Sequence, residues 1–278
     1  MDLSSIREGE LKEVFDELEE AFEHLNIDFY LIGALARDIW YARGDKKFRT
    51  TKDVDFAIMI SNKEDYEAVR SYLIENKGYR EVKTNSFVLL APAGIQVDIL
   101  PFGKIEINDE VKFEGTGLTS IKVNGFNEVY LAGTETVELS TGHTFKVATL
   151  PAIVLLKFIA YDDRPEVRAK DARDIINIML HFFDLQADLI YESHADLFGG
   201  EEMELEEIAA IAIGREMKKI VATNADLSKR LNGIIEGLLN TKEKSPFIRN
   251  MVSESGRTVE EVSNLLTRLQ TGVISQIS

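Results

Sequence analysis

Cysteine is absent from this chain of 278 residues, which excludes disulfides, thiolate metal sites and a cysteine nucleophile. The five prolines and eighteen glycines are too few for a fibrous or low-complexity protein. Long apolar runs are also missing, and the densest one, residues 150–156, is too short to cross a bilayer. The first eight residues lack the basic and apolar regions of a signal peptide. We therefore expect a soluble, cytoplasmic protein with no membrane partner.

Basic residues are in the minority, with 32 lysines and arginines against 48 aspartates and glutamates and a net charge of −16. Such an excess of negative charge repels phosphate backbones, so it argues against a large nucleic-acid footprint. Residues 37–52 are the exception, because six basic and only two acidic residues lie there. This local positive charge predicts a place where an anionic group is received.

Hydrophobic periodicity predicts alternating helices and strands in the first hundred residues. Helical spacing of apolar residues predicts helices at residues 10–25 and 63–77. A further helix is predicted at residues 34–42, directly after a strand. Short apolar runs predict strands at residues 29–32, 54–60, 87–90 and 95–100. The alternation of the two is typical of an α/β-type core.

The rest of the chain has a different pattern. From about residue 104 to 147 it carries short β segments, with a hairpin predicted at Asn124-Gly125. From Pro151, which suits the first turn of a helix, nearly everything to residue 269 has helical periodicity. We predict a core domain at residues 1–147 and an all-helical domain at residues 148–278, which is an α+β arrangement overall.

Two aspartates begin the predicted strand at residues 54–60. Asp53 and Asp55 are the only aspartates two positions apart in the chain. Strand side chains alternate between faces, so both carboxylates project to one side, roughly 6–7 Å apart. Two like charges at the edge of an apolar core repel each other, and a divalent cation such as Mg²⁺ removes that repulsion. The simpler alternative is a strand that starts at the solvent edge.

Two further residues point to the same place. Gly33 ends one predicted strand and opens a helix, where free backbone N–H groups form an anion site; taken alone, a glycine at a tight strand-to-helix turn is the simpler explanation. Asp98 is the only charge in the apolar strand at residues 95–100. A buried acid needs a partner, so Asp98 completes a predicted three-carboxylate metal site, unless its strand is an edge strand with polar residues facing water.

The helical domain opens with a lysine in an apolar run. Lys157 lies within residues 153–160, where it either reaches water along its stem or meets an anion. Arg164, Lys170 and Asp174 follow. Lys170 and Asp174 are also spaced as an ordinary i, i+4 ion pair on a helix.

These pieces, in this order, resemble the nucleotidyltransferases of the DNA polymerase β superfamily, and more narrowly the AbiEii/AbiGii toxin-type enzymes and their bacterial relatives. The matching motifs are Gly33 at the strand-to-helix turn, T-x-D-x-D from Thr51, and Asp98. The helical domain adds L-P-x-x-x-x-x-K-x-x-A from Leu150 and K-D-x-x-D from Lys170. The match covers roughly residues 28–180, and no known pattern is found in residues 181–278.

The resemblance implies a mixed-sheet core and transfer of a nucleoside monophosphate from an NTP to an acceptor hydroxyl. Asp53, Asp55 and Asp98 would bind two Mg²⁺ ions, and Asp98 would also activate the acceptor. The implied nucleotide-binding residues are Gly33, Ala34, Arg37, Thr51, Lys157, Arg164, Lys170 and Asp174. The toxin-type relatives imply tRNA or a protein as acceptor and a cognate antitoxin as partner, while a small-molecule acceptor stays open.

Ala34 departs from the family pattern, which has a small hydroxyl residue or a second glycine after the first glycine. A side-chain hydrogen bond to phosphate is lost, although the backbone N–H groups remain. Arg37, one turn along the helix, could compensate. The same departure favours a second hypothesis, a catalytically degenerate module that binds nucleotide or a partner.

Overall fold

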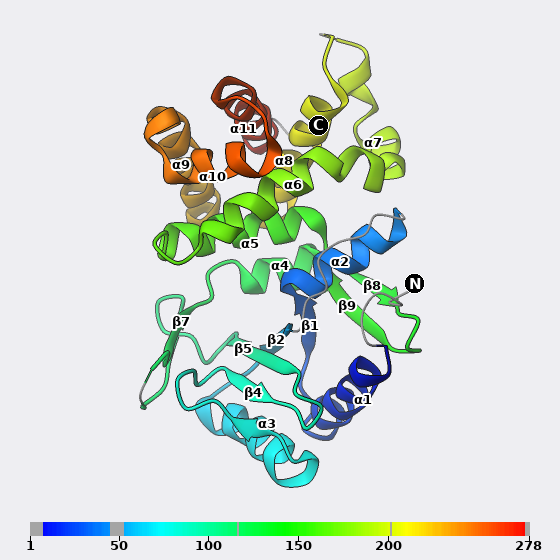
Figure 1. The fold of residues 1–278 in the computed structure, drawn as a ribbon, viewed down its shortest axis with the longest axis vertical. Coiled ribbons are helices and arrows are strands. Elements are labelled where there is room, and N and C mark those ends of the chain that lie inside the picture. Colours follow the sequence, from blue (N-terminus) through cyan, green and yellow to red (C-terminus); the bar gives the residue numbers. More distant parts are fainter. Residues whose placement is uncertain (1–7, 45–52, 116, 201, 276–278) are drawn as a thin grey trace. The chain divides into compact units, whose positions relative to one another are not determined.

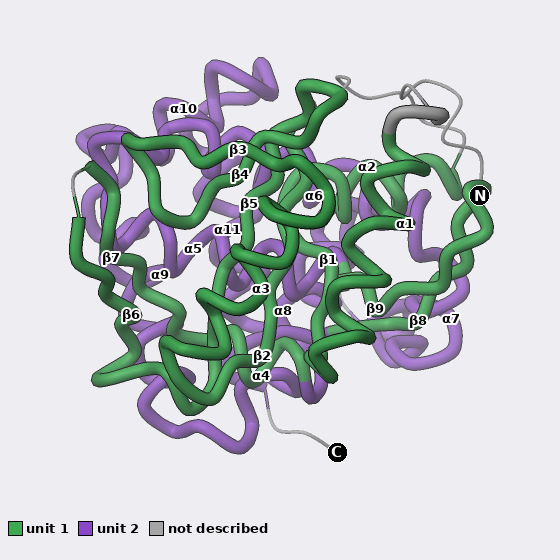
Figure 2. Tube along the Cα trace, turned by 90° about the horizontal axis from the view of Figure 1, so that it is seen from below, with its two compact units in different colours: residues 1–130, 134–149 green, residues 131–133, 150–278 purple. Residues whose placement is uncertain are grey.

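The computed structural model describes residues 8–44, 53–115, 117–200 and 202–275. The chain forms two compact units, coloured separately in Figure 2. Unit 1 comprises residues 1–130 and 134–149, and unit 2 comprises residues 131–133 and 150–278. In the described part of the chain, no helix combines the length and the apolar character needed to cross a membrane.

Unit 1 is built on a seven-stranded mixed sheet with the strand order β3-β4-β5-β2-β1-β9-β8. Its strands are β1 (Phe29–Ile32), β2 (Asp53–Met59), β3 (Arg80–Glu81), β4 (Val88–Leu90), β5 (Gln96–Phe102), β8 (Thr134–Glu138) and β9 (Thr144–Ala148). The pairs β2·β5 and β1·β9 are parallel, and the other neighbours are antiparallel. Strands β6 (Glu110–Lys112) and β7 (Ser120–Lys122) form a separate pair. The mixed sheet expected from the sequence is confirmed.

Helices pack on the sheet of unit 1 (Figure 1). They are α1 (Glu8–His24), α2 (Gly33–Arg43), α3 (Lys63–Lys77) and α4 (Phe126–Ala132). On one face Phe56 of β2 meets Phe15 and Phe22 of α1 in edge-on ring contacts. On the other face Tyr30 of β1 donates its hydroxyl hydrogen to the carbonyl of Phe126 in α4. Because neighbouring side chains on a strand alternate, Asp55 and Asp98 belong to the face that carries Tyr30.

In the described part of unit 2, all of the regular secondary structure is helical. It contains α5 (Leu150–Asp163), α6 (Ala169–Leu185), α7 (Ala187–Ser193), η1 (Ala195–Phe198), α8 (Leu205–Val221), α9 (Ala225–Thr241), η2 (Lys242–Lys244), α10 (Pro246–Ser255) and α11 (Val259–Ile274). Helix α5 is mostly apolar and mostly buried, and it packs against α6, α8 and α9. Pro151 is its second residue, as predicted for the first turn of a helix.

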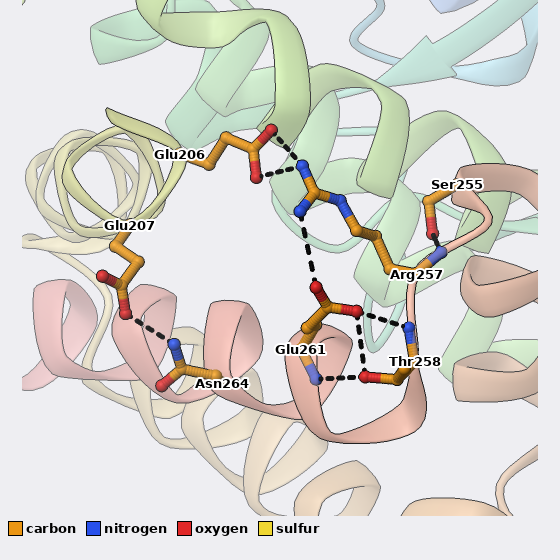
Figure 3. Close-up of polar contacts among 7 residues, drawn as sticks. All are labelled: Glu206, Glu207, Ser255, Arg257, Thr258, Glu261 and Asn264. Atoms are coloured by element: carbon orange, nitrogen blue, oxygen red, sulfur yellow. Dashed lines mark hydrogen bonds and ion pairs between the residues drawn. The ribbon is translucent and has the colours of Figure 1, made fainter. Parts of the chain in front are cut away.

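Polar contacts fix the start of α11 against α8 (Figure 3). Thr258 caps α11 through a reciprocal capping box with Glu261, which satisfies two backbone N–H groups. Arg257 binds Glu206 of α8 and also lies 3.6 Å from Glu261. The turn before α11 is therefore tied to α8 by charge as well as by apolar packing.

The predicted hairpin at Asn124-Gly125 is wrong, because these residues form the turn that opens α4. Gly125 takes the positive φ that such a turn needs, at 90°. Asn124 donates its side-chain N–H to Asp109 at 3.0 Å. The residues that follow bury Phe126 and Val129, three positions apart, which is helical rather than strand spacing. The local turn signal was correct, but it could not show which element follows.

Helices α8 and α11 cross at two glycines, which supplies a test of the packing in unit 2. A Cβ atom on Gly214 would lie 2.1 Å from the carbonyl oxygen of Leu269 and 2.9 Å from the Cα atom of Gly272. We expect Gly214→Ala to lower the free energy of unfolding by about 1–3 kcal/mol in urea denaturation followed by circular dichroism. Gly237→Ala on α9 is the control, since nothing lies within 4 Å of its Cβ position, and we expect it to be neutral or stabilising. Equal destabilisation by both changes would contradict this account.

Candidate active site

The two aspartates of the D-x-D motif lie at the start of β2. Asp53 is exposed and Asp55 half-buried, while Val54 between them is buried. This alternation places both aspartates on one face of the sheet, as the sequence predicted. The strand then continues into the core through Phe56, so the acids lie where the core meets the surface.

Asp98 of β5 is the direct neighbour of Asp55 across the parallel pair β2·β5. Adjacent strands are about 4.8 Å apart, so the two half-buried side chains stand side by side on the same face. Two positions earlier on each strand Asp53 is opposite Gln96, whose Nε2 atom donates to Oδ1 of Asp98 at 2.8 Å. The sequence indicated the acids of this group but gave no role to Gln96, although its i−2 spacing from Asp98 on a strand was visible.

Gly33 stands at the end of β1 and is the first residue of α2. Its φ of +70° favours glycine. A Cβ atom there would lie 2.1 Å from Oδ2 of Asp55 and 3.1 Å from its Cβ. Ile32, the N-cap residue, makes no side-chain capping bond, and the first turn of α2 has no acidic residue. The N–H end of a helix therefore lies beside the carboxylate of Asp55, within reach of a phosphate group held there.

The side chains predicted to assist Gly33 are arranged as follows. Ala34 is half-buried at the second position of α2. Arg37 is buried and donates from both Nε and Nη2 to Oδ1 of Asp38, at 3.0 and 2.8 Å. The charge of Arg37 is therefore already matched by a carboxylate. Thr51 lies outside the described residues, as do the other residues of 45–52, which include four of the six basic residues of the stretch 37–52.

Asp53, Asp55 and Asp98 offer carboxylate oxygens, which are the ligands that suit a hard divalent cation. Of such ions, Mg²⁺ usually binds only one or two protein carboxylates. Asp55 and Asp98 are adjacent in register, which is the arrangement such an ion needs. Within the described ranges, no group of three or more histidine, aspartate or glutamate side chains is arranged to hold a metal. The adjacent pair fits a magnesium ion that is completed by phosphate oxygens, and the three-carboxylate site stays a prediction.

In unit 2, Lys157 of α5 lies between two carboxylates of α6. Its Nζ atom is 2.9 Å from Oδ1 of Asp171 and 2.6 Å from Oδ2 of Asp174. Burial lowers the pKa of the Lys157 ammonium, but the charges of Asp171 and Asp174 outweigh it and the pKa is raised. Oδ2 of Asp171 is buried without a hydrogen-bond partner. The three side chains together carry one net negative charge.

The remaining predicted nucleotide ligands lie near this group in the sequence. Arg164 directly follows α5 and is half-buried, and Lys170 is exposed in the first turn of α6. Asp174 accepts a hydrogen bond from Lys157, so it does not depend on an i, i+4 pair with Lys170. Contact of Lys157, Arg164 and Lys170 with nucleotide stays a prediction.

Residues 2–245 match the family described as nucleotidyl transferase AbiEii toxin of the type IV toxin–antitoxin systems. The chain belongs to the AbiEii nucleotidyltransferase family. It is therefore an enzyme of nucleotidyl transfer, and the predicted resemblance is confirmed. The match continues to residue 245, beyond the stretch 28–180 that carried recognisable motifs.

Solved structures similar to this AbiEii family member include an antibiotic-resistance factor and a tRNA-processing enzyme. The antibiotic-resistance factor ANT(2'')-Ia matches in its solution structure (14% identity, 69% of this chain and 96% of that chain covered, TM-score 0.35). It also matches in complex with adenylyl-2''-tobramycin (13%, 74% and 98%, TM-score 0.40). A tRNA-processing enzyme matches with 14% identity, 93% and 77% coverage and a TM-score of 0.25. None of the curated proteins is similar in sequence to this chain.

The contact between Gly33 and Asp55 can be tested with two glycines of similar backbone conformation. In Gly33→Ala the alanine must adopt a φ of +70° and its Cβ atom collides with Asp55. In Gly94→Ala the alanine must adopt a φ of +79°, but the space around its Cβ position is open. We expect each to cost about 1–2 kcal/mol of folding free energy for the backbone strain. Only Gly33→Ala should also abolish NTP binding, measured by calorimetry, because the added Cβ atom displaces Asp55. Equal NTP binding by the two variants would show that the contact is unimportant for the site.

Removal of Lys157 should take away the ammonium group that binds both Asp171 and Asp174. We expect Lys157→Met to lower the free energy of unfolding by about 3–5 kcal/mol at pH 7.5, measured in urea. The loss should shrink at lower pH, since protonation of a carboxylate removes the negative charge that the missing ammonium group would have matched. In the wild type the raised pKa of Lys157 keeps the ion pairs intact across this range.

The control for Lys157→Met is Lys170→Met, which removes an exposed lysine from α6. We expect it to change stability by no more than about 0.5 kcal/mol at pH 7.5 and at lower pH. A Lys157→Met loss that is small, or that does not depend on pH, would mean that the two carboxylates do not need the lysine.

Proposed function

We propose that this enzyme transfers a nucleoside monophosphate from an NTP to an acceptor hydroxyl with Mg²⁺, using the acids of β2 and β5. The observation that carries the proposal is the adjacency of Asp55 and Asp98 in register, with the carboxylate of Asp55 against Gly33 at the start of α2. That arrangement joins oxygen ligands for a metal to backbone donors for phosphate in one place.

In the proposed reaction, the acceptor oxygen attacks the α-phosphorus of the NTP, and the bond from that phosphorus to the β-phosphate oxygen breaks. Pyrophosphate leaves with the electron pair of that bond, and the hydroxyl proton passes to Asp98. The N-terminal N–H groups of α2 bind the phosphates and keep the α-phosphorus in line. Asp53, Asp55 and Asp98 would hold Mg²⁺, and the bound ion would neutralise charge on the triphosphate.

We propose a macromolecular acceptor, tRNA or a protein, in keeping with the toxin systems to which the family belongs. The six basic residues among residues 37–52 support an anionic ligand close to the start of β2 in the sequence. A cognate antitoxin is the partner that a type IV system implies. An aminoglycoside-like hydroxyl compound is the competing acceptor.

The proposal is tested with Asp53→Asn and Asp98→Asn, which keep the shape of each side chain and remove its charge. We expect transfer of labelled nucleotide to fall on the order of a hundredfold in each variant. Calorimetry with each of the four NTPs, with Mg²⁺ or with a chelator, shows which base is preferred and whether binding needs the metal. Pooled tRNA, a protein extract and an aminoglycoside serve as acceptors.

Asp28→Asn is the matched control, because Asp28 is an exposed aspartate of unit 1 just before β1. It should leave binding and transfer unchanged. Folded Asp53→Asn and Asp98→Asn variants with wild-type transfer would refute the proposed site. Metal-dependent NTP binding without transfer to any acceptor would instead favour a degenerate module that only binds nucleotide.

A further inference from the structure

The four side chains at the start of β2 and β5 form a small grid. Asp53 is in register with Gln96, and Asp55 is in register with Asp98. All four belong to the same face of the sheet because their positions differ by two along each strand. Three members are carboxylates, which only accept hydrogen bonds when ionised, and the fourth is an amide with two N–H donors. Gln96 therefore supplies the hydrogen-bond donors of this grid.

That donor is directed at one atom. Nε2 of Gln96 lies 2.8 Å from Oδ1 of Asp98, and both side chains are half-buried. A carboxylate that accepts a hydrogen bond from a neighbouring amide on one oxygen keeps its plane fixed, which is how residues beside a metal ligand orient that ligand. The backbone of Gln96 is held in turn, because β5 pairs with β2 on one side and with β4 on the other, where Gln96 is opposite Leu90.

We propose that Gln96 is a positioning residue for Asp98: its amide orients the carboxylate toward metal and acceptor. This inference rests on the proposed function of the acids. A glutamate in the same place would offer a fourth carboxylate and no donor when ionised, so charge repulsion would turn Asp98 away. The amide gives the site a donor without adding charge.

The test compares Gln96→Met, which keeps the length of the side chain and removes the donor, with the wild type. Binding of Mn²⁺ in the presence of the preferred NTP is followed by the loss of the free-ion signal in electron paramagnetic resonance. We expect about 10- to 100-fold weaker Mn²⁺ binding, the usual effect of removing a residue that orients a metal ligand. In transfer assays we expect a similar fall in kcat with little change in KM for the NTP, because Gln96 acts through Asp98.

Gln270→Met is the matched control, since Gln270 also donates a 3.0 Å side-chain hydrogen bond from a half-buried position, but in unit 2. It should bind Mn²⁺ and transfer nucleotide like the wild type. If circular dichroism shows that Gln96→Met does not fold, Gln96→Glu at pH 8 is used in its place. Glutamate has the same shape as glutamine, and we expect the fall in kcat to be equal to or larger than that expected for Gln96→Met.

The outcomes separate the two ideas. Wild-type Mn²⁺ binding and kcat in a folded Gln96 variant, alongside an inactive Asp98→Asn, would overturn the positioning role and leave the proposed function intact. A higher KM for the NTP with unchanged kcat would also overturn the positioning role, because that pattern indicates that Gln96 contacts the nucleotide. A wild-type enzyme that neither binds Mn²⁺ with NTP nor transfers nucleotide would overturn the proposed function itself.

Discussion

The candidate site depends on the close approach of one carboxylate to one stretch of backbone. Asp55 lies so near Gly33 that an added Cβ atom would be 2.1 Å from its Oδ2 atom. The antiparallel pair β1·β2 sets this distance, because it places Ile32 opposite Asp55 and so brings the turn into α2 beside the acid. The parallel neighbour β5 then adds Asp98 on the same face. The carboxylates and the backbone donors of the candidate site meet because β1, β2 and β5 are neighbours in the sheet with this register.

Buried cations in each unit have carboxylate partners from the same unit. Arg37 binds Asp38, and Lys157 binds Asp171 and Asp174, so each of these cations has a carboxylate of its own unit close by. Buried cations of this kind stabilise a fold only while their partners remain. The neutralisation of a triphosphate therefore falls, in our proposal, to the start of α2 and to the bound metal rather than to Arg37. Oδ2 of Asp171 accepts no hydrogen bond, but it lies 3.9 Å from Nη1 of Arg168, so this carboxylate has a second cation of its own unit close by.

Elements with strong periodicity were predicted well from the sequence. The strand at residues 29–32 and the helix at residues 63–77 agree with β1 and α3 residue for residue, since apolar spacing and clear end signals coincide there. The two-residue strand β3 and the helix α4 were not predicted, because a short element has too few residues to show a period. Gln96 was missed for a different reason, since a glutamine on a strand carries no signal until its neighbours are known.

The sequence by itself determined the acids, the glycine and the order of motifs, and with them the family and the mixed-sheet core. These are local features: D-x-D on a strand puts two carboxylates on one face whatever lies next to it. Only the tertiary structure decided which strand lies beside β2, that Asp98 stands next to Asp55, and that Lys157 is held by two aspartates 14 and 17 positions away. Strand order and ion pairing between helices depend on long-range packing, which spacing along one segment does not specify.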